Sequence, residues 1–175
     1  MPSPDAPSQP PVLSAAAFRA LMRHQAGAVA VIAVGREGAR TGLTATAVCS
    51  LSDDPPSLLI CVNQAASAHG VIQETGAFSV NMLASDQADV AAKFAGAGGI
   101  KGEQRFLGDP WETGLSGAPR LRSALASLDC RVVDAHAFAT HSIFLATVIG
   151  GDAREEASPL IYLRGSFTHV ASPDA

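Results

Sequence analysis

The sequence predicts a mainly β protein, an antiparallel barrel with a few flanking α-helices. Short apolar runs rich in β-branched residues recur along the chain, whereas amphipathic helical stretches are few. Strand and helix patterns do not alternate as they do in a doubly wound sheet. A dinucleotide fingerprint is also missing, because Lys101 stands where the third glycine should follow Gly96 and Gly98.

The N-terminal segment differs in composition from the rest of the chain. Residues 1–12 hold five of the eleven prolines and lack the basic and apolar regions of a signal peptide, so we expect a disordered arm. One domain is then expected over residues 13–171. Ser14 is placed to cap a first helix that runs to Met22 and is stopped by Gly27.

Strands are predicted to follow this helix. Residues 29–34 and 41–48 form apolar runs around a turn and are expected to make a hairpin. A third strand is expected over residues 58–62, directly after Pro55-Pro56, because proline is tolerated at the start of a strand. Ser67 then opens a short helix.

The second half of the chain is also predicted to be rich in strands. A strand over residues 78–83 precedes a helix that Ser85 or Asp86 caps. Residues 95–120 are rich in glycine and charge and read as a long loop, with a turn of helix near residues 101–106. The remaining strands are predicted over residues 125–133, 135–139, 142–149 and 160–163.

Composition limits the classes of function. The chain has a net charge of −4, no basic run and only 5% aromatic residues, which argues against a nucleic-acid-binding protein. Charged residues are 16% of the chain, so we expect a second copy to cover part of its surface. Cys49, Cys61 and Cys130 lack CxxC spacing, which is typical of small core residues in the reducing cytoplasm. No apolar run reaches the ~18 residues that span a membrane.

The segment from Thr41 to Ser67 is the most informative part of the chain. It is poor in charge and rich in small and hydroxyl side chains, and Asp53-Asp54-Pro55-Pro56 interrupts it once. Small side chains allow a flat ligand to lie against the backbone, whose amides and nearby hydroxyls supply hydrogen bonds. A tightly packed pair of strands around a Pro-Pro turn explains the same composition, and the residues alone leave both interpretations open.

Ordered motifs over residues 14–170 make the chain resemble the short-chain flavin reductase family. The motifs are TGLTATAVCSLSDDPPSLLICVN, Ser67, GAFSVNMLASDQADVAAKFAG, Arg105-Phe106, Thr140-His141 and Pro159-Leu160-Ile161-Tyr162. The resemblance is greatest to the branches of the family that serve pyrimidine utilisation and 4-hydroxyphenylacetate hydroxylation. Several motifs in a fixed order are a more specific signal than any one of them.

The resemblance implies a fold and a function. The implied fold is an antiparallel Greek-key FMN-binding split β-barrel, in a homodimer whose flavin groove lies close to the interface. The implied reaction is hydride transfer from NADH, or NADPH, to FMN, or FAD, followed by delivery of reduced flavin to a separate monooxygenase. Two alternatives stay open: an oxidase with tightly held FMN, and a flavin carrier or sensor without turnover.

The resemblance also assigns residues to the flavin ring. The segment that lines the ring is matched by Thr44, Ala45, Thr46 and Ala47. Its small side chains would leave one face of the ring open to a hydride donor. The strand end beneath the flavin is matched by Cys61, Val62 and Asn63, although Cys61 is expected to pack rather than react.

Four further residues are assigned to the ribityl chain and phosphate. Ser50 either bonds this part of the flavin or caps the turn at Asp53-Asp54. Ser67 opens a helix whose first amides suit a phosphate, and it also reads as an ordinary N-cap. His69 adds charge there or is a surface histidine. Arg105 has the planar fork that suits a phosphate contact.

His141 is the residue that the resemblance marks as catalytic. It ends a stretch that in the family often reads Gly-Asp-His and is tied to nicotinamide binding, whereas Ala139 and Thr140 precede it here. The missing aspartate puts any role for an acid at position 140 in doubt. Tyr162 matches an aromatic position near the flavin, with simple packing as the alternative. The histidines form no spacing typical of a metal site, so no metal is expected.

Overall fold

The computed structural model describes residues 12–154 and 157–170, and it is mainly β as predicted. The helical segments are α1 (Ala15–Met22), α2 (Ser67–Thr75), α3 (Ala88–Phe94) and the 3₁₀ turns η1 (Ala97–Gly99) and η2 (Gly102–Phe106). The strands are β1 (Gly27–Ala28), β2 (Ala30–Val34), β3 (Thr41–Ala45), β4 (Val48–Asp53), β5 (Pro56–Asn63), β6 (Ala77–Met82), β7 (Trp111–Thr113), β8 (Pro119–Leu121), β9 (Ala126–Phe138), β10 (His141–Ala153), β11 (Leu160–Leu163) and β12 (Ser166–His169). None of the helices in the described ranges is long and apolar enough to cross a membrane. The predicted arm falls, apart from Val12, outside the described residues.

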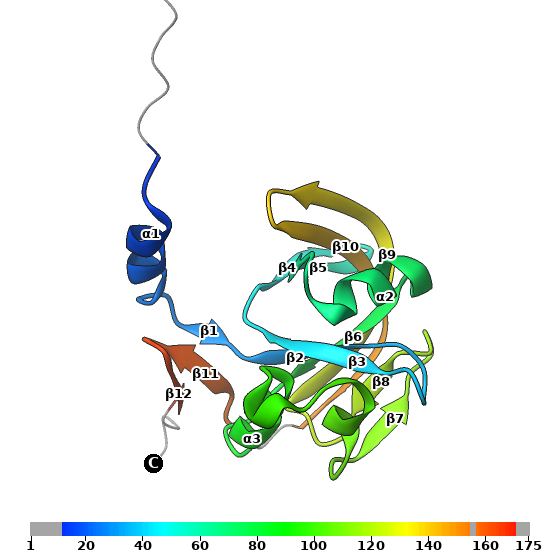
Figure 1. Ribbon diagram of the computed structural model, residues 1–175. Helices are drawn as coiled ribbons and strands as arrows, with labels where there is room; N and C mark the ends of the chain where they lie inside the picture. Colours follow the sequence, from blue (N-terminus) through cyan, green and yellow to red (C-terminus); the bar gives the residue numbers. More distant parts are fainter. Residues whose placement is uncertain (1–11, 155–156, 171–175) are drawn as a thin grey trace, which may run out of the picture.

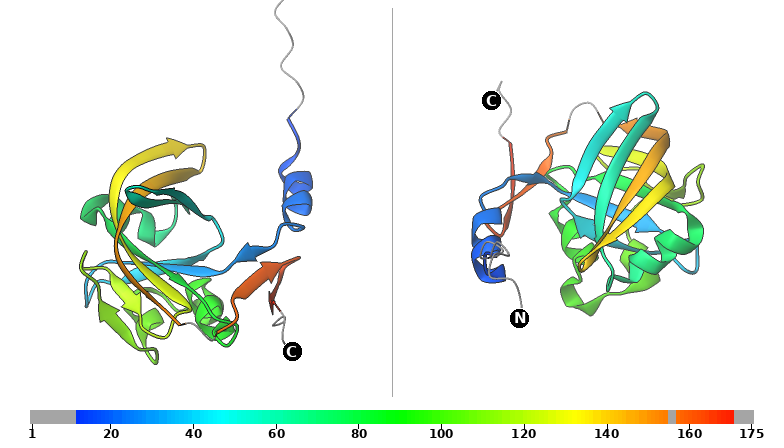
Figure 2. Two further views of the ribbon diagram at one scale, coloured as in Figure 1. Left: turned by 180° about the vertical axis from the view of Figure 1, so that it is seen from behind. Right: turned by 90° about the horizontal axis from the view of Figure 1, so that it is seen from above.

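One curled sheet forms the body of the molecule (Figure 1). Seven antiparallel strands pair in the order β3-β2-β6-β9-β10-β5-β4. The two edge strands, β3 and β4, are consecutive in the chain, and only Thr46 and Ala47 separate them. So short a link can join opposite edges only if the sheet curls round on itself, as Figure 2 shows. The two edges do not pair with each other within the described residues, so the barrel is split between β3 and β4, which confirms the predicted fold class.

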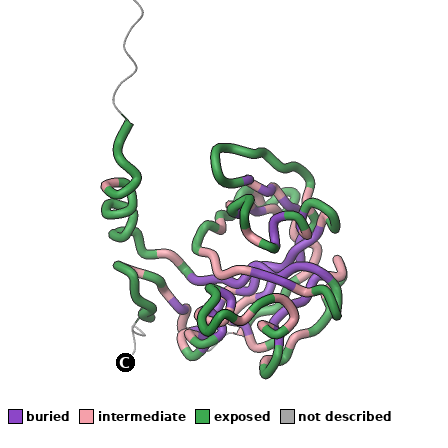
Figure 3. The backbone as a smooth tube through the Cα atoms, viewed as in Figure 1, coloured by how far each residue is buried: buried purple, intermediate pink, exposed green. Residues whose placement is uncertain are grey.

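The strand β2, which pairs with β3 and β6, is buried on both faces. Ala30, Ile32 and Val34 pack in a cluster with residues of β5, β6 and α2. Val31 and Ala33 point the other way, into a second cluster that contains residues of α3 and η2. A strand covered on both faces has no need of polar alternation, which explains the continuous apolar run AVIAV. Figure 3 shows this burial at the centre of the molecule, with α1 and the tip of the β9–β10 hairpin exposed.

A small second sheet stands beside the barrel. β1 pairs with β11, which pairs with β12, and α1 lies next to these strands (Figures 1 and 2). Ser14 caps α1 as predicted, since its Oγ accepts a hydrogen bond from the Ala17 amide. No residue of α1 is buried. The first and last described segments of the chain therefore meet on one side of the split.

Some predicted strand limits are wrong. The single strand expected over residues 41–48 is broken at Thr46, where the chain crosses from one edge of the sheet to the other. The two strands expected over residues 125–133 and 135–139 are one continuous strand, β9. A bulge at Val133, between the pairs Leu145–Asp134 and Ala146–Val132, keeps the strand continuous past the polar Asp134.

Tertiary contacts account for two other differences. The loop predicted over residues 95–120 contains the β7–β8 hairpin, which Trp111 holds by packing on the rings of Phe94 and Phe106. Helix α3 starts after Gln87 rather than at Ser85 or Asp86. The Gln87 side chain accepts a hydrogen bond from the Ala84 amide. Its Nε2 donates hydrogen bonds to the carbonyl oxygen and the Oγ of Ser123, which is distant along the chain. The strand β12 lies outside every predicted strand.

Candidate functional site

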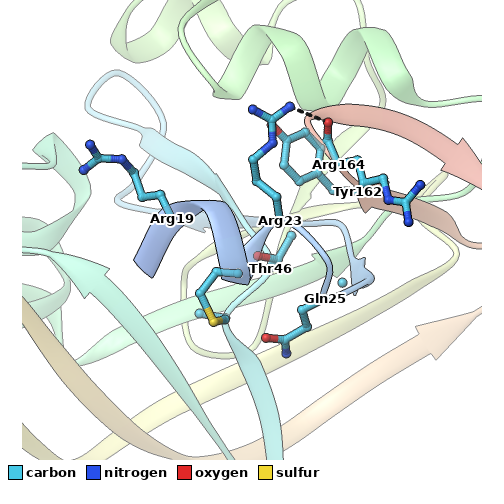
Figure 4. A pocket seen from close by; sticks show the side chains of 9 residues that line it. Arg19, Arg23, Gln25, Thr46, Tyr162 and Arg164 are labelled. Carbon is cyan, nitrogen blue, oxygen red and sulfur yellow. Dashed lines mark hydrogen bonds between the residues drawn. The ribbon is translucent and has the colours of Figure 1, made fainter. Parts of the chain in front are cut away.

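The bend between β3 and β4 borders two cavities that share Thr46 and Tyr162. One cavity of about 550 Å³ is lined by Thr46, Ala47 and Tyr162 together with residues of α1 (Figure 4). The other, of about 250 Å³, is lined by Thr44, Ala45, Thr46 and Tyr162 together with Phe167 of β12. The structure thus brings together all four predicted ring-lining residues and the predicted aromatic residue.

Gly27 is a site residue that the sequence did not reveal. It pairs with Tyr162 across β1 and β11, and a Cβ atom at this position would come within 2.9 Å of the Thr46 Cβ atom. Ordinary side chains do not tolerate so close an approach, so glycine is required for β1 to lie against the bend. Nothing in the sequence near Gly27 indicates this contact, because Thr46 is distant along the chain.

The threonines and alanines of the bend have different environments. The Thr44 hydroxyl donates a 2.6 Å hydrogen bond to the carbonyl oxygen of Ala91, so it fastens β3 to α3. Ala45 packs against the core. Thr46 and Ala47 are both exposed, at the point where the backbone leaves the sheet. The bend therefore offers a ligand small side chains, at a point where the backbone lies outside both β3 and β4.

A hydrogen-bonded path connects the bend to His141. The Cys61 amide donates a 3.2 Å bond to the carbonyl oxygen of Ala47, which joins β5 to the bend. Two residues further along β5, Asn63 pairs with His141 of β10. The His141 ring is exposed, and its Nδ1 lies 2.9 Å from the Thr140 hydroxyl, which replaces the aspartate of the family pattern as its neighbour.

Some predicted contacts on β4 and β5 need correction. Val62 is completely buried in the core, so its side chain does not reach a ligand. Ser50 is exposed on β4 and does not cap the turn after it. That role belongs to Ser52, whose Oγ accepts a bond from the Asp54 amide. Cys49 is exposed and not a core residue as predicted, because it lies on the edge strand β4.

The start of α2 lies beside the start of β3. The Ser67 and Thr41 hydroxyl oxygens are 2.8 Å apart. Ser67 is the first residue of α2 and not its N-cap; Ala66 holds the cap position without a side-chain bond. His69 is buried rather than a surface histidine: its Nε2 lies 2.8 Å from the Ser142 Oγ, and its ring packs edge-on against Phe144.

Arg105 reaches the same end of β3. Its Nη1 donates a 2.5 Å bond to the carbonyl oxygen of Gly42, and its Nε donates a 3.0 Å bond to that of Ile100. The guanidinium and the Ser67 hydroxyl thus lie beside neighbouring residues of β3. The bend at Thr46 is at the opposite end of this strand, roughly 16 Å away at about 3.3 Å per residue.

Neither the Cys130 thiol nor the arrangement of possible metal ligands in the described residues suggests a redox or metal centre. Burial, and then the charge of Asp129, raises the pKa of the Cys130 thiol to about 12, so it stays protonated. Cys61 is partly buried in the sheet, and the described residues contain no group of three or more His, Cys, Asp or Glu side chains placed to hold a metal ion. The open bend is the feature best suited to hold a cofactor.

Comparison with known proteins identifies the family to which the chain belongs. The flavin reductase like domain matches residues 22–171. This chain belongs to the flavin reductase like domain family. The resemblance inferred from the motifs is confirmed.

Individual flavin reductase relatives are similar over most of their length. The FMN reductase (NADH) RutF of Pseudomonas syringae pv. syringae is 39% identical over 160 residues, which are 91% of this chain and 89% of that protein. The 4-hydroxyphenylacetate 3-monooxygenase reductase component of Pseudomonas aeruginosa is 37% identical over 157 residues, 90% of this chain and 92% of that protein.

A solved structure of a family member has the same fold. The NADH:FAD oxidoreductase SgcE6 of Streptomyces globisporus, in complex with NAD and FAD fragments, has a TM-score of 0.81 and 30% identity. The comparison covers 90% of this chain and 93% of that one. The curled sheet and its split are therefore features that this flavin reductase like domain shares with a family member solved by experiment.

Proposed function

We propose that this flavin reductase like protein transfers hydride from NADH to FMN and releases the reduced flavin to a separate monooxygenase. The observation that carries the proposal is the open bend at Thr46 and Ala47, which borders two cavities in a chain of this family. The names of the relatives support NADH and FMN as the substrates and a monooxygenase as the recipient. FAD is the alternative flavin and NADPH the alternative donor.

The residues of the bend fit a flat ring. Ala45 and Ala47 add little bulk, the exposed Thr46 offers a hydroxyl, and Tyr162 flanks the ring position from β11. Flavin, when bound, supplies the ring that accepts the hydride, so the protein needs to provide position and access rather than a strong acid or base. The phosphate is proposed to lie at the other end of β3, where the Ser67 hydroxyl lies beside that of Thr41 and Arg105 donates to the Gly42 carbonyl oxygen.

His141 is proposed to position the nicotinamide. It lies on the β9–β10 hairpin. Strand β10 of this hairpin pairs with β5, and β5 is joined to the bend by the hydrogen bond from the Cys61 amide to the Ala47 carbonyl oxygen. Its ring is exposed and oriented by the Thr140 hydroxyl. Nδ1 faces that hydroxyl, which leaves Nε2 to face a ligand. A hydrogen bond to the nicotinamide amide would fix the donor without any change in the charge of the histidine.

A homodimer in the cytoplasm is part of the same proposal. The residues Phe18 and Leu21 of α1 are 55% and 64% exposed, and no residue of α1 is buried. A helix with an uncovered apolar face is stabilised when a second copy covers it. The three cysteines are free, which fits a reducing compartment.

Mixing the purified protein with FMN and NADH, and following the nicotinamide absorbance, tests the reaction. We expect NADH to be lost only when flavin is present, and loss that does not depend on flavin would contradict the proposal. His141→Ala should raise KM for NADH by roughly tenfold, because a hydrogen bond to the donor is removed, while the dissociation constant for FMN stays within about twofold. His136→Ala, on the same exposed hairpin, is the matched control.

A further inference from the structure

Three arginines line the larger cavity beside the bend. Arg19 and Arg23 come from the C-terminal end of α1, and Arg164 comes from the turn between β11 and β12. The same cavity of about 550 Å³ is bordered by Thr46 and Tyr162 (Figure 4). Within residues 12–154 and 157–170, no aspartate or glutamate lines it. The cavity therefore carries concentrated positive charge directly next to the proposed flavin position.

This concentration is unusual for such a chain. The net charge is −4, with 12 Lys and Arg against 16 Asp and Glu, yet three of those cations border one cavity. Among the described residues, Arg40, Lys93 and Arg120 form ion pairs, whereas none of the three cavity arginines does. Positive charge that no carboxylate balances attracts an anionic ligand.

The backbone holds the arginines in place. The Arg164 amide donates a 3.0 Å bond to the Arg23 carbonyl oxygen, and the Arg23 Nη2 donates a 2.6 Å bond to the Arg164 carbonyl oxygen. A Cβ atom at Gly165 would lie 2.7 Å from the Arg23 Nη2, so this glycine leaves room for the guanidinium. The end of α1 and the β11–β12 turn are thereby joined into one wall of the cavity.

Stability alone explains only part of this arrangement. Cations near a helix C-terminus interact favourably with the helix dipole, which accounts for Arg19 and Arg23. Arg164 is different, because its φ of 53° lies in the left-handed region, where glycine or asparagine is preferred. The two-residue turn between β11 and β12 requires a positive φ at both Arg164 and Gly165, and asparagine is the usual residue at the first position, so an arginine here points to a role for its side chain.

The shape of the cluster identifies the class of ligand. The three guanidinium groups lie at separate points around the cavity rather than converging on one position (Figure 4). Such a spacing suits an extended anion with more than one phosphate, and the guanidinium fork binds phosphate in a bidentate manner. The FMN phosphate is already assigned to Ser67 and Arg105 at the far end of β3, so these arginines remain for another ligand.

We propose that Arg19, Arg23 and Arg164 bind the diphosphate of a dinucleotide that lies against the flavin bend. The proposal rests on the proposed function, since it takes the bend as the flavin position. The diphosphate can come from the nicotinamide dinucleotide or from FAD. In either case the arginines favour dinucleotides over ligands that carry a single phosphate.

Direct binding measurements with the variant Arg19→Gln/Arg164→Gln test the proposal. Arg23 is left unchanged because it holds the turn. Isothermal titration is carried out with NADH, reduced nicotinamide mononucleotide, FAD and FMN. We expect the dissociation constant of the dinucleotide to rise at least tenfold, because charge-assisted bonds to phosphate are lost. Binding of FMN and of the reduced mononucleotide should stay within about twofold of wild type.

The titrations with NADH and with FAD show which of these two dinucleotides supplies the diphosphate. Weaker binding of NADH alone assigns the site to the nicotinamide dinucleotide, and weaker binding of FAD alone assigns it to the flavin. Arg122→Gln, which replaces an exposed arginine on another face, is the control for a general loss of charge. For the wild type, dinucleotide binding should also weaken with salt more steeply than mononucleotide binding, a readout that needs no variant.

Two results would overturn the proposal. One is unchanged binding of both dinucleotides by the variant. The other is a variant that loses only dimer affinity, measured by sedimentation, since the arginines would then belong to a subunit interface. Failure of the proposed function looks different: wild-type protein would bind the nucleotides with the same dependence on the arginines but would not oxidise NADH when flavin is present.

Discussion

Single residues decide how closely the two sides of the site approach each other. Gly27 allows β1 to touch the bend at Thr46, and Ala47 connects the bend to β5 through one backbone hydrogen bond. These contacts involve atoms with little freedom, because backbone and Cβ positions cannot rotate away as a long side chain can. Small substitutions here should affect ligand binding more than they affect folding.

Gly27→Ala is expected to weaken flavin binding by roughly tenfold, or about 1.4 kcal/mol. The new methyl group would meet the Thr46 Cβ atom at 2.9 Å and displace the bend. Flavin fluorescence titration measures the effect. Gly70→Ala is the matched control, because nothing lies within 4 Å of its Cβ position in α2. If both variants bind flavin equally well, the bend is not the flavin position.

The hydrogen bond between His69 and Ser142 should make a measurable contribution to stability. Both residues are buried, so removing either one leaves the other without its partner in the core. We expect His69→Ala and Ser142→Ala each to lower the free energy of unfolding by about 1–3 kcal/mol. Urea denaturation of the two variants, of the double variant and of the exposed control Gln73→Ala checks this. Strict additivity in the double variant would show that the two side chains are not coupled.

At the scale of elements, polar contacts fasten the loops to the barrel. Glu103 of η2 accepts bonds from the amides of Gly38 and Arg40, and from the Arg40 Nε at 2.6 Å. Partial burial by itself raises the pKa of the Glu103 carboxyl, but the bonds from Arg40 and Gly38 outweigh it and hold the pKa below the ordinary value of 4.5. The turn before β3 is thereby attached to the loop that carries Arg105.

This contact predicts a specific pH dependence of stability. A carboxyl with a lowered pKa in the folded state stabilises that state above its unfolded pKa, and the effect is lost as the pH falls through the folded pKa. The stability difference between wild type and Glu103→Gln should therefore be largest near neutral pH and should shrink below about pH 4.5. Urea midpoints at several pH values measure it, with Glu37→Gln as the control. A difference that grows on acidification would contradict the assignment.

Comparison of the predicted and observed elements shows which ones local sequence patterns can predict. The β2–β3 hairpin, the strand after Pro55-Pro56 and the helix at Ser67 were predicted from local signals that the structure contains. The β7–β8 hairpin was missed because Trp111 is held by Phe94 and Phe106, which local patterns do not connect. The Ser67 cap was predicted wrongly because the hydroxyl instead faces Thr41, a partner from another strand.

In the whole molecule, the helix α1 and the second sheet stand beside the split barrel, and the apolar side chains of α1, Tyr162 and Phe167 are exposed. This side of the molecule carries Phe18 and Leu21, and it lies near the cavity that Arg19 and Arg23 border. A subunit that covers this side would also enclose the neighbourhood of the proposed flavin position. Dimer formation and ligand binding are then expected to influence each other.

Phe18→Asp/Leu21→Asp is expected to weaken the proposed dimer by at least tenfold, because charge replaces the apolar face of α1. Sedimentation equilibrium measures the change. Leu115→Asp is the control, since this side chain is 75% exposed on a loop away from α1. Dimer affinity that is unchanged in the α1 variant, or lowered equally in the control, would exclude α1 as the interface.

Sequence patterns were sufficient to predict the family, the mainly antiparallel class and most of the residues at the bend. These predictions follow from local composition and from motifs in a fixed order, and both can be recognised without knowing which distant residues are in contact. Three other features became apparent in the folded molecule: Gly27 meets Thr46, His69 is buried against Ser142, and three arginines border one cavity. Such contacts join residues far apart in the chain, so no local pattern of the sequence encodes them.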